Sequence, residues 1–244
     1  MDCVLKLINL KKLYKNGRGV EDVTFDVNKG DVVGLLGPNG SGKTTTMRAI
    51  IGLCPPTSGH IEIFGYDVET AYEKATEKVG ALIEMPALFG NMSAHQNLKM
   101  AARFYPNIGE DRIQYILKLV ELDRYQRDKV GKFSLGMKQR LGLGLALLSD
   151  PEFVVLDEPA NGLDIEGIIH VREIITRLAA ERGVTFLVAS HIASELEKTC
   201  NKVAVIHDGK MLSFDSMDNA LRYQPTLEDY FLSVVKEKKG GVIL

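Results

Sequence analysis

One stretch near the N-terminus decides the fold: Val32-Val33-Gly34-Leu35-Leu36-Gly37-Pro38-Asn39-Gly40-Ser41-Gly42-Lys43-Thr44-Thr45. It opens with an apolar run typical of a buried strand, turns through glycines, and enters a helical pattern. Its fixed positions match G-x-x-x-x-G-K-[ST], the pattern of a phosphate-binding loop. Glycines let backbone N–H groups curl around an anion, and the helix N-terminus adds partial positive charge. We therefore expect a nucleotide phosphate site.

The side chains of this loop have separate expected tasks. Lys43 reaches the β- and γ-phosphates, and the Thr44 hydroxyl is placed to ligate a Mg²⁺ ion that bridges them. ATP and Mg²⁺ are thus the predicted cofactors. The other residues of the loop expected to contact the nucleotide are Asn39, Gly40, Ser41, Gly42 and Thr45.

A second apolar strand, Phe153–Leu156, ends in the carboxylates Asp157 and Glu158. Carboxyl ends of parallel strands are where such sheets bind ligands. Asp157 fits a second Mg²⁺ contact through water, and Glu158 fits a general base that polarises the attacking water. The alternative for either residue is a helix cap.

Strands and helices alternate around these two motifs, which predicts a parallel sheet covered by helices on both faces. The fold class expected is α/β: a P-loop NTPase (RecA-like) core, with an N-terminal antiparallel β subdomain and an inserted helical subdomain. The chain is expected to form one domain, residues 1–244. Its expected parts are a core of about 1–84 and 150–215, a helical subdomain of about 85–149, and a C-terminal helical tail of about 216–244.

Composition narrows the class of protein. Of 244 residues, 45% are hydrophobic and 25% are charged, as in a globular protein with a real core. A net charge of -2 gives no reason to expect nucleic acid as a partner. The longest apolar run, Leu141–Leu148, is far below the roughly 20 residues of a membrane span, so we do not expect this chain to cross a bilayer.

Four further features narrow the phosphate-loop class. Phe133-Ser134-Leu135-Gly136-Met137-Lys138-Gln139-Arg140 resembles the ABC signature, and Ala160–Asp164 resembles the D-loop. His191 follows an apolar strand, as the switch histidine of that family does, and Tyr14 precedes the phosphate loop. In order and spacing the chain resembles the nucleotide-binding subunit of an ABC transporter.

The resemblance implies further roles and partners. Ser134 and Gly136 would complete the ATP site of a second copy in a head-to-tail dimer, and Asp164 would link the two sites. His191 would hydrogen-bond the γ-phosphate, joining Glu158 and Lys43 as catalytic residues, while the Tyr14 ring would lie against adenine. An integral-membrane permease would be the other partner, placing this chain in the cytoplasm, peripheral on the inner face of the membrane.

Two departures refine the resemblance. Glu84 stands where the family usually has a glutamine that touches Mg²⁺ and water, and Leu135-Gly136-Met137 replaces Gly-Gly-Gln in the signature. Both departures resemble the sequences found at these positions in ATPases of bacitracin- and lantibiotic-resistance exporters. Glu84 is therefore a predicted metal contact, with an exposed loop glutamate as the alternative, and the predicted function is export of a peptide antibiotic, giving immunity or resistance.

Two other functions stay open at this point. One is a soluble ABC ATPase that works on ribosomes or DNA, although a single cassette and about 90 residues between loop and signature do not favour it. The other is a nucleotide-dependent regulator without turnover, an alternative that the Glu84 replacement leaves open.

Overall fold

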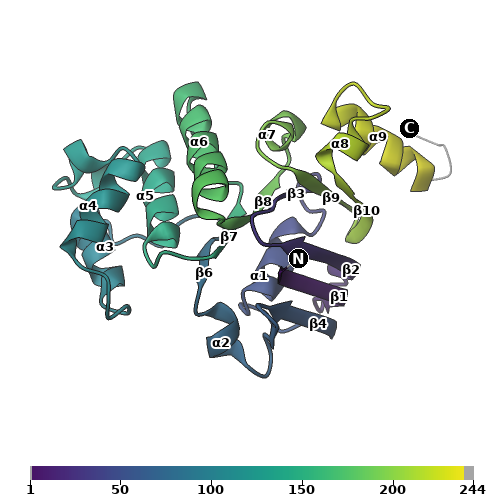
Figure 1. Ribbon diagram of the computed structural model, residues 1–244, viewed down its shortest axis with the longest axis horizontal. Coiled ribbons are helices and arrows are strands. Elements are labelled where there is room, and N and C mark those ends of the chain that lie inside the picture. The colour runs from purple at the N-terminus through teal and green to yellow at the C-terminus, as the bar shows by residue number, and fades with distance from the viewer. Residues whose placement is uncertain (1, 239–244) are drawn as a thin grey trace.

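The computed structural model describes residues 2–238 and is built around one curled sheet (Figure 1). Neighbouring strands, from one edge to the other, are β5 (Tyr66–Asp67), β4 (Ser58–Ile63), β1 (Cys3–Leu13), β2 (Gly19–Asn28), β10 (Lys210–Ser216), β9 (Lys202–His207), β3 (Val32–Leu36), β8 (Thr185–Ser190), β7 (Phe153–Asp157) and β6 (Val79–Leu82).

The half of the sheet that carries the motifs is parallel. Strands β9, β3, β8, β7 and β6 pair in parallel with one another, in that order. The register aligns Leu36 with Ser190, Asp157 with Ala189, and Leu82 with Leu156. The four loops that follow β3, β8, β7 and β6 therefore leave the sheet at one common edge.

The other half of the sheet is mainly antiparallel. β1 pairs antiparallel with β2 and β4, and β4 pairs antiparallel with β5. β10 joins the halves: it pairs antiparallel with β9 and touches β2 in parallel through Lys210 and Glu21. The predicted α/β fold, with its parallel core and N-terminal antiparallel part, is confirmed.

Each buried strand sends alternate side chains into two different cores, as a period of two requires. Along β7, Val154 and Leu156 face one core while Phe153 and Val155 face the other. The second core also holds apolar residues of α1 (Lys43–Ile50), and the first holds residues of α6 (Ile165–Arg182) and α7 (Ala193–Glu197). In Figure 1, α1 accordingly lies on the opposite side of the strands from α6 and α7.

The chain between β6 and β7 contains helices and no strand. They are α3 (Ala94–Ala102), α4 (Glu110–Leu119), η1 (Asp123–Tyr125), η2 (Val130–Lys132) and α5 (Leu135–Leu147). Figure 1 shows α3, α4 and α5 together at one end of the molecule. Ser93 caps α3 in a reciprocal capping box with Gln96. The remaining short helix before β6 is α2 (Tyr72–Thr76).

The C-terminal part is helical as far as it is described. It contains α8 (Met217–Ala220) and α9 (Leu227–Lys238), and α9 contacts α7 and β10. Residues 239–244 of the expected tail lie outside the described residues. Within residues 2–238, no helix combines the length and the hydropathy that crossing a bilayer requires.

Candidate functional site

Four loops at the carboxyl edge of the parallel strands hold most of the predicted site residues. The phosphate loop follows β3, His191 follows β8, the pair Asp157 and Glu158 closes β7, and Glu84 follows β6. Because β3, β8, β7 and β6 are successive neighbours, residues far apart in sequence meet along this edge.

The phosphate loop has the backbone that an anion site requires. Gly42 precedes α1 in a left-handed conformation, with φ 112°, and a Cβ there would stand 2.2 Å from the Val20 Cγ1 atom. Only glycine fits both conditions. The buried Ser41 hydroxyl has no hydrogen-bond partner among residues 2–238. Buried polar atoms are normally paired, so a phosphate oxygen is a fitting missing partner.

Lys43 lies buried inside the loop and is held by the chain itself. Its Nζ donates to the Gly37 carbonyl oxygen at 2.7 Å and lies 3.5 Å from Glu158 Oε1. The other carboxylate oxygen of Glu158, Oε2, lies 2.9 Å from His191 Nδ1. The three predicted catalytic residues therefore form one connected group, in which Glu158 lies between a cation and a histidine.

Glu158 has an unusual backbone conformation for a residue with a side chain. Its φ is 51°, in the left-handed region, and its N–H donates to the Ala189 carbonyl of the neighbouring strand. Its own carbonyl accepts from the amide of Gln139, which is buried on α5. Residues held in such conformations gather at functional sites, where surrounding contacts keep them in place.

Asp157 and Thr44 meet at the strand end as predicted for metal contacts. The Thr44 hydroxyl donates to Asp157 Oδ2 at 2.7 Å, while Asp157 Oδ1 is buried without a hydrogen-bond partner among the described residues. Burial, offset in part by the Thr44 hydrogen bond, raises the pKa of the Asp157 carboxyl. Such a carboxylate suits a cation that would restore its lost solvation.

The residues at this strand end fit a metal ion that also takes ligands from substrate and water. No cluster of three or more His, Cys, Asp or Glu side chains able to hold a metal occurs in residues 2–238. Mg²⁺ usually keeps several waters and binds through one or two carboxylates together with substrate phosphates. The pair of Thr44 and Asp157 fits that mode of binding.

A cavity of about 310 Å³ opens beside the phosphate loop. The residues that line it are Tyr14, Asn16, Arg18, Gly19, Asn39, Gly40, Gly42, Lys43, Thr44, Thr45 and Glu158. The Tyr14 ring is partly exposed, with Lys12 Nζ 5.5 Å from its centroid. The structure thus places the predicted adenine-stacking ring at the same cavity as the phosphate loop.

Glu84 does not line that cavity. Its φ is 57°, and its Oε2 accepts from the guanidinium of Arg48 at 2.9 Å. Its charge nevertheless contributes to raising the pKa of Asp157, so the two carboxylates interact. Glu84 is therefore near the proposed metal site but paired elsewhere in this structure.

Three predicted residues lie on other surfaces. Exposed Ser134 caps α5 by accepting from the Met137 N–H at 3.2 Å, and Asp164 caps α6 by accepting from the Gly167 N–H at 2.9 Å. A Cβ on Gly136 would stand 3.1 Å from Leu163 of the D-loop. The signature and the D-loop of one chain therefore pack together, and neither lines the 310 Å³ cavity of that chain.

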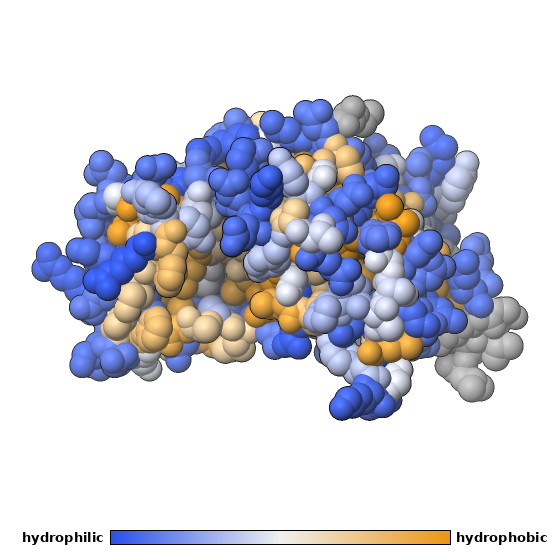
Figure 2. All heavy atoms as spheres, turned by 90° about the horizontal axis from the view of Figure 1, so that it is seen from below, coloured by the Kyte–Doolittle hydropathy of each residue, from blue (hydrophilic) through white to orange (hydrophobic). Residues whose placement is uncertain are grey.

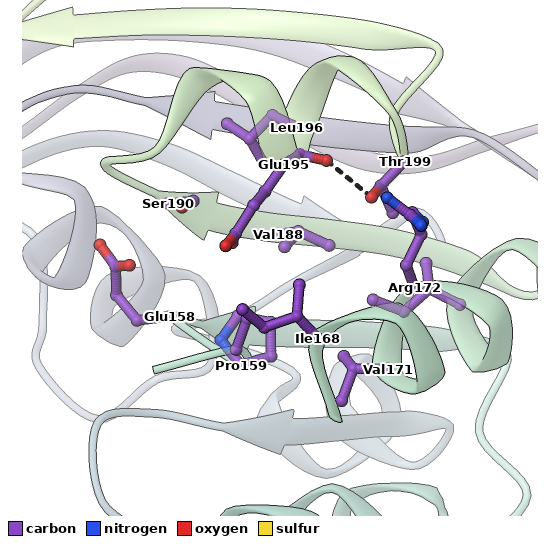
Figure 3. Close-up of a pocket in the computed structure, with 12 residues that line it drawn as sticks. Glu158, Pro159, Ile168, Val171, Arg172, Val188, Ser190, Glu195, Leu196 and Thr199 are labelled. Atoms are coloured by element: carbon purple, nitrogen blue, oxygen red, sulfur yellow. Dashed lines mark hydrogen bonds between the residues drawn. The ribbon is translucent and has the colours of Figure 1, made fainter. Parts of the chain in front are cut away.

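Sequence reasoning missed three residues beside the site: Arg48, Gln139 and Glu195. Figure 3 shows the Glu195 side chain reaching from α7 into a cavity that Glu158 and Ser190 also line. Burial and the charge of Glu158 raise the pKa of the Glu195 carboxyl. For Arg48, its spacing of four residues from Thr44 in a predicted helix was an available signal.

Comparison with known proteins agrees with this geometry. Residues 20–161, more than half of the chain, match the family described as "ABC transporter". The chain is 42% identical over 212 residues to the bacitracin transport ATP-binding protein BcrA of Bacillus licheniformis, covering 87% of this chain and 69% of that protein. It is 38% identical over 219 residues to the lantibiotic transport ATP-binding protein SrtF of Streptococcus pyogenes, covering 88% and 93% of the two chains.

A solved structure described as the ATP-binding subunit of an ABC transporter superposes with a TM-score of 0.85 at 29% identity, covering 96% of this chain and all of that one. The family match, these relatives and the loops gathered at one sheet edge lead to the same conclusion: the chain belongs to the ABC transporter family, as one of its ATP-binding, ATP-hydrolysing subunits.

Proposed function

We propose that this chain couples ATP hydrolysis to the export of a peptide antibiotic, through a membrane permease on another polypeptide. The observation that carries the catalytic part is the group of Lys43, Glu158 and His191 beside the phosphate loop. The transport names of the bacitracin and lantibiotic relatives support the cargo.

The proposed hydrolysis uses Glu158 as the base. Its carboxylate takes a proton from water, whose oxygen forms a bond to the γ-phosphorus as the bond from that phosphorus to the bridging oxygen breaks, giving ADP and phosphate. The Lys43 ammonium group compensates the charge of Glu158 in this structure and contacts the β- and γ-phosphates instead when ATP binds. His191 then donates to the γ-phosphate.

Mg²⁺, when bound, neutralises developing charge on the phosphates. Thr44 and Asp157 are the residues proposed to hold it, and Glu84 is a third proposed contact that must first leave Arg48. The hydrogen bond from Thr44 holds the Asp157 carboxylate at the strand end before the ion arrives.

The working unit proposed is a head-to-tail homodimer. Exposed Ser134 begins a helix of 13 residues, where the hydroxyl and the N-terminal N–H groups are suited to bind an anion. Because Ser134 and Gly136 do not line the cavity of their own chain, they are available to the ATP of a second copy. A two-fold axis would then form two such sites.

The permease is proposed to contact the chain beside Glu84. The segment from 85 to 104 exposes three large apolar side chains, Met85, Phe89 and Phe104. Figure 2 shows apolar residues gathered on the lower face, on the side of the molecule where the α3–α5 segment lies. Exposed apolar patches of this kind mark interaction surfaces. We propose a peripheral location on the cytoplasmic face of the membrane for this reason.

Glu158→Gln tests the base assignment. Gln keeps the size of the side chain but cannot take a proton from water, so steady-state phosphate release with Mg²⁺ and ATP should fall at least ~100-fold. ATP affinity, measured by calorimetry, should stay within a few fold of the wild type. Phosphate release that continues at the wild-type rate would refute the role of Glu158, and no release from either protein would favour the regulator alternative.

Asp157→Asn tests whether the charge of the Asp157 carboxylate is uncompensated in the metal-free protein. The folded pKa of Asp157 lies above its unfolded value, so its charge destabilises the metal-free fold at neutral pH, and the penalty shrinks as pH falls through the folded pKa. Asn still accepts from Thr44. The melting temperature of the metal-free variant should exceed that of the wild type at pH 7, with a smaller gain in acid.

A second buried aspartate serves as the control for that experiment. Asp31 accepts from Lys202 Nζ at 2.7 Å and from the Asn28 N–H at 2.9 Å, so its charge is compensated. Asp31→Asn should therefore lower the melting temperature under the same conditions. If both variants are destabilised alike at pH 7, Asp157 is an ordinary structural carboxylate.

Ser134→Arg tests the shared ATP site. A long cation in place of the cap would occupy the position proposed for the γ-phosphate of the second copy. In the Glu158→Gln background, ATP should convert the chain from monomer to dimer on gel filtration, and the added Ser134→Arg should abolish the conversion. A dimer that forms equally well in both proteins would rule out the cross-subunit role.

A further inference from the structure

The ion pair between Arg48 and Glu84 connects two functional elements. Arg48 lies on α1 four residues after Thr44, hence on the same face of that helix one turn further on. Its Nη2 atom lies 2.9 Å from Oε2 of Glu84, which follows β6. The pair therefore joins the helix that begins at the phosphate loop to the outermost of the four strands that end at the site.

Stability alone does not account for this pair. The side chains of Arg48 and Glu84 are 39% and 55% exposed, and exposed ion pairs contribute little to folding. Glu84 also has a left-handed backbone, which residues with a side chain adopt only when their surroundings hold them there. The contact fixes where the carboxylate points, and that direction is toward Arg48 and not into the nucleotide cavity.

The negative charge at the site explains why the Glu84 carboxylate needs a cation beside it. The charges of Glu158 and Glu84 both act on Asp157, and this site must admit a highly negative triphosphate. Lys43 lies beside Glu158, and Arg48 compensates Glu84. A glutamine in place of Glu84 would need no counter-ion, so Arg48 matters here because this chain carries a carboxylate at that position.

The segment that Arg48 holds is also packed against the signature helix. Pro86, two residues after Glu84, lies so close to Gly142 of α5 that a Cβ on Gly142 would stand 2.7 Å from the Pro86 Cβ atom. The signature residue Ser134 is the N-cap of α5. A displacement of the segment at Glu84 would therefore press directly on the helix that carries the signature.

We propose that Arg48 is a positioning residue that acts through Glu84. It keeps the Glu84 carboxylate neutralised and away from the phosphates until Mg²⁺ and ATP arrive, and Glu84 then exchanges Arg48 for the metal or its water. The movement shifts Pro86 and so adjusts α5. This inference rests on the proposed ATP site and adds a residue that the sequence did not single out.

The test is a double-mutant cycle of Arg48→Gln and Glu84→Gln in the full chain. The affinity for a non-hydrolysable ATP analogue is measured by calorimetry with Mg²⁺ and again with EDTA, and the ratio of the two dissociation constants gives the Mg²⁺ dependence. Arg48→Gln frees Glu84, so the Mg²⁺ dependence should increase roughly two- to fivefold, the strength of an exposed ion pair. In the Glu84→Gln background, the same substitution should leave the ratio unchanged.

Lys78→Gln is the matched control, because Lys78 forms a comparable exposed pair with Glu152 at the opposite end of β6. It should leave the ratio at the wild-type value. An unchanged ratio in Arg48→Gln, or an equal change with and without Glu84, overturns the role of Arg48 while leaving the ATP site intact. A wild-type chain that binds the analogue in neither condition overturns the proposed site itself and the role of Arg48 with it.

Discussion

The parallel register of β3, β8, β7 and β6 is the constraint on which the rest of the structure depends. It brings the phosphate loop, His191, the pair of Asp157 and Glu158, and Glu84 to one edge, although they are spread over most of the sequence. Alternation of apolar side chains along these strands fills a core on each face, and those cores fix the helices that extend from the loops. The positions of these site residues therefore depend on side-chain packing in the two cores, away from the reacting groups.

Electrostatics at this edge follow a single pattern. Three carboxylates at this edge each have a nearby group of the chain that partly offsets their charge: Lys43 for Glu158, the Thr44 hydroxyl for Asp157, and Arg48 for Glu84. These are the same groups that we propose to meet phosphate and metal when ATP binds. The nucleotide-free site is thus held by contacts that ligand binding would replace, which links occupancy of the site to movement of its loops.

Sequence predicted the features that are local. The phosphate loop and the acidic strand end could be recognised because their function requires specific residues at short, fixed spacing. Strand β10 was missed because its residues are only half-buried and its place depends on pairing with β9 and β2. The contacts of Arg48 with Glu84 and of Gln139 with Glu158 were also missed, because they join segments that only the folded chain brings together.

The most direct measurement is a crystal structure of the Glu158→Gln protein with Mg²⁺ and ATP. The account predicts the triphosphate inside the loop of residues 37–44, with Mg²⁺ contacted by the Thr44 hydroxyl. It also predicts Ser134 of a second copy at the γ-phosphate and Glu84 released from Arg48. Nucleotide bound away from that loop, or a metal without contact to Thr44, would contradict the central claim that the four strand ends form one ATP site.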